Sequence, residues 1–323
     1  MKAKLVALSM AAVALAMAGC SNDENEEMDN WNGEIRLSSG VAVQTRANTQ
    51  AEQIQSGETV YAWVDKATTG ESYINAWTLT AQGNGSFKGN SKYYPTDGST
   101  LDFYALHGNF ASGAFTEDAT AFPETDVVHL VEADQSDEGM KNYAKSDLLY
   151  AVKKGVKRGS DAVKLEFYHM LSKVEVALKS GDGNPDLTDA IVTIEGTKLK
   201  ARFRPDKDTG QQRADMITIV DNDNDPISIK IRTVVTEDFD KNTEYAEAIL
   251  VPNQELKRNA TFINVLPKGG SIFSYKIPEN LTLESGKKYT YKITVNQSGL
   301  SVSSDIKNWD PVGDAKEGEA TMD

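Results

Sequence analysis

The stretch KKYTYKITV, residues 287–295, decides the fold class of this chain. Tyr, Tyr, Ile and Val occupy every second position from 289 to 295, and Lys or Thr stands between them. This alternation is typical of a strand with one face in a core and the other in water. Similar runs occur at Val60–Val64, Leu101–Leu106, Leu148–Val152, Val163–Phe167, Ile191–Ile194, Ile227–Ile231 and Ile249–Val251. The sequence therefore predicts an all-β protein.

Turn residues separate these runs, and few stretches favour a helix. Gly, Asp, Asn and Pro gather in the turns, as in Ser180–Pro185 and Glu284–Gly286. Asn48–Gln55 and Glu138–Lys145 are the two short helix candidates. Many short strands with regularly spaced turns predict β-sandwich architecture.

A change of phase near residue 170 indicates where one sandwich ends. Between 167 and 171 the same-face positions are odd-numbered, whereas the apolar positions between 174 and 178 are even-numbered. A shift of one residue turns a strand over. Either a bulge lies at Ser172–Lys173 or the chain leaves one sandwich there and enters the next. We expect two domains that meet near residue 170.

The first twenty residues have the features of an export signal. Lys2 and Lys4 precede fourteen uncharged residues, Leu5–Ala18, a run too short to remain as a membrane-spanning helix. The following Met-Ala-Gly-Cys, residues 17–20, resembles the lipobox of bacterial lipoproteins, in which the thiol receives diacylglycerol before cleavage. We therefore expect residues 1–19 to be removed and Cys20 to be lipidated. The alternative is a free Cys that closes an ordinary signal peptide.

Charge and cysteine content limit the function classes. The formal net charge is −14, and no basic patch with interleaved aromatics occurs, so binding to nucleic acid is not expected. Cys20 is the single cysteine, which excludes an intrachain disulfide. The acidic residues 21–30 cannot bury enough apolar area to fold and predict a solvated tether.

The sequence contains little that predicts catalysis, a cofactor or a metal. His107, His129 and His169 are far apart, and each lies in or beside a predicted strand. His169, on an apolar strand face, is interpreted as a hydrogen-bonded structural residue and not as a base. No nucleophile elbow, zinc motif or phosphate-binding loop is present. Asp221–Pro226 alternates oxygen ligands like a calcium loop, but Pro226 stands where Gly is needed, which favours an acidic turn. Trp77, Tyr93 and Tyr94 either form a sugar-binding platform or fill a core.

Five stretches of the sequence match, in order, the signatures of one protein family. Lys92–Ala105 contains a P-x-D-G-x-x-L-D-F-Y-A segment as PTDGSTLDFYA. The other four are Asp147–Ala151, Leu165–Val174, Ala248–Gln254 and Tyr291–Trp309. Together they extend over about residues 35–312, nearly all of the mature chain, and they resemble the fimbrillin (Mfa-like) family.

The resemblance implies two tandem transthyretin-like β-sandwiches in a subunit of type V fimbriae. Such a precursor reaches the outer membrane as a lipoprotein, and an arginine-specific protease then removes its first strand. A strand of a neighbouring subunit fills the exposed groove. The cleavage position corresponds to Arg46–Ala47, and Ile35–Val43 alternates like a removable strand. Leu300, Val302 and Ile306 are the donor-strand candidates, although the polar end of the chain leaves the donated segment open.

The predicted organisation is therefore a signal peptide (1–19), a tether with the removable strand (20–46) and two sandwiches (47–170 and 171–323). The expected partners are other fimbrial subunits, the outer membrane through the lipid, and a ligand on a host or bacterial surface. No catalytic residue, metal or cofactor is expected. The alternatives are a monomeric surface lipoprotein that binds glycans and, third, an enzyme. Stalk, tip and anchor roles all remain open, since an anchor would keep its lipid and first strand.

Overall fold

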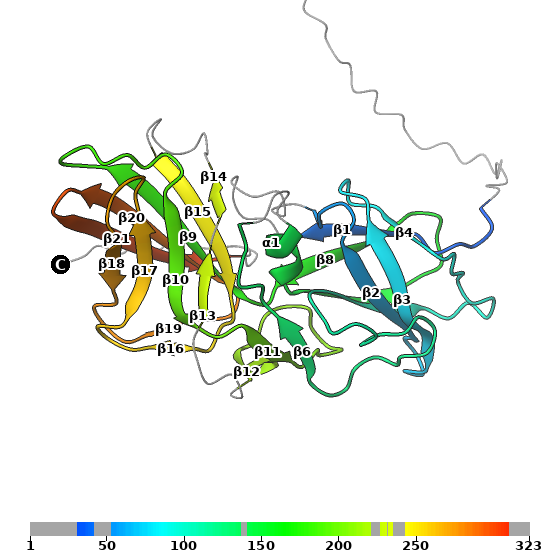
Figure 1. Ribbon diagram of the computed structural model, residues 1–323. Coiled ribbons are helices and arrows are strands. Elements are labelled where there is room, and N and C mark those ends of the chain that lie inside the picture. The colour runs from blue at the N-terminus through cyan, green and yellow to red at the C-terminus, as the bar shows by residue number, and fades with distance from the viewer. Residues whose placement is uncertain are drawn as a thin grey trace, which may run out of the picture. The chain divides into compact units, whose positions relative to one another are not determined.

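The computed structural model describes residues 31–41, 53–136, 141–220, 227–230, 232–234 and 243–309. The compact unit begins at Gly33. Its regular elements are almost all strands, with one α-helix, α1 (Lys141–Ser146), and one 3₁₀ turn among the described residues (Figure 1). The prediction of an all-β protein is confirmed. The helix candidate at 138–145 overlaps α1, whereas residues 53–55 of the other candidate are not helical.

The N-terminal half is built on a seven-stranded sheet. Its order is β1-β8-β7-β5-β2-β3-β4, and β1 is parallel to β8 while the other neighbours are antiparallel. The bounds are β1 (Leu37–Val41), β2 (Thr59–Lys66), β3 (Ser72–Ala81), β4 (Phe87–Gly89), β5 (Leu101–His107), β7 (Leu149–Val156) and β8 (Val163–His169). All seven residues of β5 are buried, so this central strand forms the middle of the core.

Two sheets form the C-terminal half. The five-stranded sheet has the order β14-β15-β9-β20-β21, and the four-stranded sheet has the order β13-β10-β17-β18. Their bounds are β9 (Ser172–Ser180), β10 (Ile191–Thr197), β13 (Ile227–Lys230), β14 (Arg232–Val234), β15 (Thr243–Leu250), β17 (Thr261–Leu266), β18 (Phe273–Lys276), β20 (Lys287–Asn296) and β21 (Gly299–Asn308). The rings of Phe262 on β17 and Tyr291 on β20 pack 5.7 Å apart, which joins the two sheets across one core.

The chain passes from the seven-stranded to the five-stranded sheet between His169, the end of β8, and Ser172, the start of β9. A small three-stranded sheet also connects the halves. In it β6 (Val127–Leu130) pairs with β11 (Lys200–Phe203), and β12 (Ile217–Ile219) pairs with the other side of β11. A two-stranded ribbon of β16 (Glu255–Leu256) and β19 (Leu281–Thr282) completes the elements. Among the described residues no helix has the length and hydropathy to cross a membrane.

Candidate functional site

β1 lies between β8 and the segment around β4. On one side it runs parallel to β8, with Leu37 opposite Val163 and Val41 opposite Phe167. On the other side isolated bridges join Glu34 to Tyr93 and Ser38 to Ser86. The Ser39 amide donates to the Gly85 carbonyl at 2.7 Å, and the Ile35 amide donates to the Lys92 carbonyl at 2.7 Å. Both edges of β1 are therefore used, and β1 closes the sheet (Figure 1).

The inner face of β1 covers an apolar surface. Ile35 and Leu37 are 3% and 6% exposed, whereas Arg36 between them points to solvent. Beside β1 in the same sheet, Leu165 and Phe167 of β8 are fully buried. A cavity of about 300 Å³ follows β1 and is lined by residues of β1, β3 and β4, among them Trp77, Leu79 and Phe87. Exposed residues such as Arg36, Asn90 and Ser91 also line this cavity, so it is a surface groove that runs beside β1.

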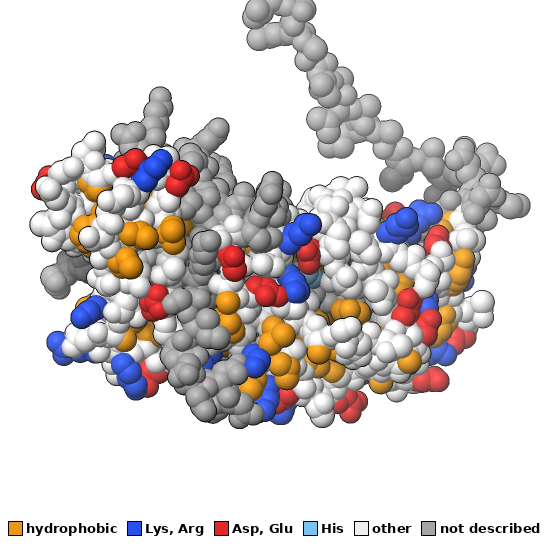
Figure 2. Space-filling model, viewed as in Figure 1, with side chains coloured by type: hydrophobic (Ala, Val, Ile, Leu, Met, Phe, Trp, Pro, Cys, Tyr) orange, Lys and Arg blue, Asp and Glu red, His pale blue; other side chains and the backbone are white. Residues whose placement is uncertain are grey.

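β21 lies at the edge of the five-stranded sheet. It pairs with β20 over its whole length, from Gly299 opposite Asn296 to Asn308 opposite Lys287. Within the described residues, no strand pairs with its other edge. Leu300 and Val302 are partly buried against the core, but Ile306 is 52% exposed. Figure 2 shows apolar side chains gathered over β18 and β21. The three predicted donor residues thus lie on one outer strand.

The other sequence-predicted site residues, Cys20, Arg46 and Ala47, lie outside the described residues. Their roles stay predictions. In the sequence, Arg46 follows the last residue of β1, Val41, by five positions. A cut there would leave β1 attached to its sheet only through non-covalent contacts.

Trp309 fixes the end of β21, a contact that the sequence did not predict. Its ring stacks on His169 with centroids 3.8 Å apart and planes 9° apart. Its backbone amide donates to the Gly286 carbonyl at 2.6 Å. His169 in turn contacts the buried carboxylate of Asp147 at 2.9 Å. The pattern of a single strand cannot reveal a stacking partner 140 positions away.

The three histidines are buried in structural surroundings. His107 lies 2.8 Å from the Thr59 carbonyl oxygen and 3.1 Å from that of Ala144. His129 Nε2 donates to the Ser146 carbonyl at 2.9 Å, and Nδ1 accepts the Asn109 amide. Burial lowers the pKa of His129 to about 4. Since all three side chains are at most 3% exposed, they support the core and do not face an open cleft.

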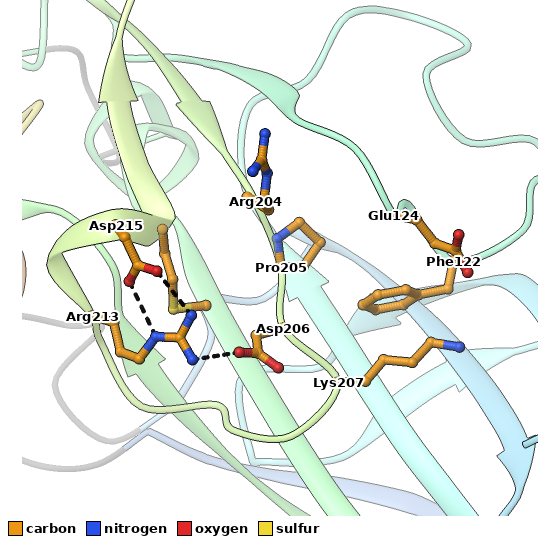
Figure 3. Close-up of a pocket in the computed structure, with 9 residues that line it drawn as sticks. Phe122, Glu124, Arg204, Pro205, Asp206, Lys207, Arg213 and Asp215 are labelled. Atoms are coloured by element: carbon orange, nitrogen blue, oxygen red, sulfur yellow. Dashed lines mark hydrogen bonds and ion pairs between the residues drawn. The ribbon is translucent and has the colours of Figure 1, made fainter.

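A charged pocket of about 360 Å³ lies beside the loop after β11 (Figure 3). Arg213 binds Asp206 at 2.5 Å and Asp215 at 3.0 Å. Lys207 reaches Asp65 of β2 at 2.6 Å and lies 4.9 Å from the centre of the Phe122 ring. These cations are paired with carboxylates of the same chain, so the pocket links the loop to the N-terminal half.

The structure corrects the aromatic-platform alternative and leaves the calcium-loop motif outside its range. Trp77 and Tyr94 are each 4% exposed and belong to the core, while Tyr93 is 47% exposed. A single exposed ring does not form a platform. In the described part of the chain, no group of three or more His, Cys, Asp or Glu could hold a metal. Asp221–Pro226 lies outside that part.

Comparison with known proteins agrees with this architecture. The profile described as Fimbrillin-like matches residues 45–309. A curated relative, "Putative fimbrium subunit Fim1C" of Bacteroides uniformis, is 26% identical over an alignment of 326 positions that covers 96% of each chain.

Two crystal structures share the fold, each of "a putative cell adhesion protein". The one from Bacteroides uniformis has a TM-score of 0.57 and 21% identity, and covers 86% of this chain and 98% of its own. The one from Bacteroides ovatus has a TM-score of 0.59 and 17% identity, with coverages of 87% and 99%.

Proposed function

This chain belongs to the fimbrillin-like family, and we propose that it is a structural subunit of an adhesive surface filament, a type V fimbria, assembled by strand exchange. It works by polymerising with other fimbrial subunits and not by catalysis. The observation that carries the proposal is the place of β1, which fills a gap between β8 and β4. A sheet that lacks one strand has unpaired backbone groups and uncovered apolar core residues. A strand of a second subunit pairs with the former and covers the latter at the same time.

The processing steps follow from the order of the N-terminal segments. Lipid on Cys20 holds the exported precursor at the outer membrane, and the acidic tether at 21–30 separates the lipid from β1. A protease cut between Arg46 and Ala47 then frees β1 together with the lipid. The groove that remains takes the donor strand, for which β21 is the candidate because it pairs along only one edge. The filament lies on the cell surface, with a ligand on a host or bacterial surface as its target.

The experiment is electrophoresis of sheared surface material without boiling. Native protein should give a ladder of strand-exchanged polymers whose subunits begin at Ala47, as read by N-terminal sequencing. Arg46→Ala should remove the ladder, and the matched control Arg36→Ala should keep it because Arg36 faces outward beside β1. A single unboiled band for native protein, or subunits that begin at Cys20, would contradict the cleaved-subunit proposal.

Lipidation has its own test. Cys20→Ser should abolish labelling by a fatty-acid analogue, because no other cysteine is present in the chain. Continued labelling of this variant would exclude Cys20 as the lipid site without affecting the strand-exchange proposal.

A further inference from the structure

The inner faces of β1 and β21 carry the same order of residue types in the same chain direction. In the N-terminal strand, positions 35, 37, 39 and 41 are Ile, Leu, Ser and Val. In β21, positions 300, 302, 304 and 306 are Leu, Val, Ser and Ile. These β21 residues lie opposite the core residues Val295, Ile293, Tyr291 and Tyr289 of β20. At these alternate positions both strands thus carry the order apolar, apolar, Ser, apolar.

We propose that β21 of a second copy replaces β1 parallel to β8, in the one register that puts Leu300 in the place of Ile35. This inference rests on the proposed strand exchange and adds its direction and register. Val302 then takes the place of Leu37, Ser304 that of Ser39, and Ile306 that of Val41.

The two apolar positions at the start of the groove favour this register. Ile35 and Leu37 are 3% and 6% exposed, so their places accept only apolar side chains without cost. A strand that runs the opposite way over the same seven positions puts Ser304 in the place of Leu37. If Ser304 is instead kept at Ser39 in the opposite direction, Asn308 falls in the place of Ile35. Both of these reversed registers bury a polar side chain in the place of Ile35 or Leu37.

The place of Ser39 is suited to a hydroxyl group. The Gly85 carbonyl, which accepts the Ser39 amide, also accepts the Ser39 hydroxyl at 3.4 Å. In the proposed register Ser304 supplies the same hydroxyl to the same carbonyl. An apolar residue at this position would leave the Gly85 carbonyl with one hydrogen bond fewer.

The ammonium group of Lys164 lies beside Gly40, whose place Asp305 takes in the proposed register. A Cβ atom built on Gly40 lies 3.1 Å from Cε and 3.8 Å from Nζ of Lys164, and no atom of its register partner Glu166 lies within 4 Å. A carboxylate on that Cβ therefore reaches the Lys164 ammonium. In the proposed register the residue at this position is Asp305, whereas the two reversed registers put Ser301 or Ser303 there.

Exchange also buries a side chain that β21 leaves exposed. Ile306 is 52% exposed in the edge strand. In the place of Val41 its register partner is Phe167, which is fully buried. The transfer of Ile306 itself removes apolar surface from water, which is one contribution in favour of the exchanged state.

Engineered disulfides can read the register directly. The chain cut after Arg46 has lost Cys20, its single cysteine, so added cysteines react without competition. One partner is the cut chain with Glu166→Cys. The other is a mass-tagged cut chain that carries Asp305→Cys, Ser301→Cys or Ser303→Cys. After each pair is mixed and oxidised, non-reducing electrophoresis measures the amount of mixed dimer. Since a disulfide needs Cα atoms within about 7 Å, the Asp305→Cys pair should exceed the other two by about tenfold.

The alternative results overturn the inference in distinguishable ways. A dominant Ser301→Cys or Ser303→Cys pair would establish a reversed strand. Polymer by size-exclusion without any preferred pair would refute the register while strand exchange stands. Absence of polymer from native cut protein would refute both. As a second measurement, Lys164→Glu should slow polymerisation by about tenfold, and Lys164→Glu with Asp305→Lys should restore it, because the ion pair is reversed. Equal polymerisation rates for the native protein, Lys164→Glu and the double variant would contradict the Asp305–Lys164 contact.

Discussion

Lys173 is a fully buried cation on the face of β9 that points away from the sandwich core. Its ammonium lies 2.7 Å from Glu247 and 3.1 Å from Glu175, and Lys288 binds Glu175 from the other side at 3.4 Å. Burial favours the neutral amine, but the two carboxylates outweigh it and raise the pKa of Lys173. The group therefore acts as one charged network in which each member depends on the others.

Removing the cation alone should be strongly destabilising. Lys173→Met leaves Glu247 buried without its counter-ion and should lower the free energy of unfolding by about 3 to 5 kcal/mol. Urea unfolding at pH 7 measures it. The double variant Lys173→Met with Glu247→Leu should recover most of the loss, because it removes the unpaired charge as well. If Lys173→Met and the native protein were equally stable, the network would be solvated and the prediction wrong.

His129 makes stability depend on pH. Its pKa is lowered to about 4 in the folded protein, so the unfolded chain binds a proton more readily between pH 6.5 and 4. The contribution of neutral His129 is complete above pH 6.5 and falls by up to about 3 kcal/mol as the pH drops to 4. Urea unfolding from pH 7 to pH 4 should show a shallower slope for His129→Gln. Parallel curves for the two proteins would contradict this assignment.

Individual residues were predicted from the sequence only where a local pattern defines their environment. The structural interpretation of His169 agrees with its burial. Trp77 and Tyr94 could not be assigned, because an aromatic residue in a strand fits a core and an exposed surface equally well. The stack of Trp309 on His169 depends on tertiary packing, which no short window of sequence contains.

At the scale of elements, β1 and β8 form a parallel pair whose members are more than 120 positions apart in the chain. Strands with clear alternation, such as β20, β8 and β1, could be predicted from sequence. Their partners could not, since period-two patterning defines the faces of a strand but not its neighbours. β3 lacked a clear prediction because its pairing with β2 shifts register near Ala76, which has a positive φ of 38°.

Weakening β1 should open the groove without any protease. Leu37→Asp puts a charge in a position that is 6% exposed. We expect the amides of β1 and of the facing edge of β8 to exchange about 100-fold faster in hydrogen-exchange mass spectrometry. The matched control Arg36→Asp changes the neighbouring, outward-facing position and should leave exchange unchanged. Equal exchange in both variants would show that β1 is not held by its inner face.

At the scale of the whole molecule, the proposed donor strand β21 and the proposed acceptor groove at β1 belong to one continuous framework. β1 closes the N-terminal sheet, β21 is the outer strand of the C-terminal sheet, and β6 with β11 and β12 forms a sheet shared by both halves. The family could be predicted from sequence because its motifs occur in the expected order along the chain. The closure of the sheet by β1 could not, because it needs the positions of β8 and β4 at once.

If β1 blocks assembly until it is removed, the mass of the protein in solution must depend on the cut after Arg46. Size-exclusion chromatography with light scattering should compare purified precursor, precursor cut after Arg46, and protease-treated Arg46→Ala protein. We expect a monomer for the uncut precursor, polymer for the cut chain, and a monomer for Arg46→Ala. Polymer formed by the uncut precursor, or a cut chain that stays monomeric with its groove empty, would contradict the role of β1 as the block.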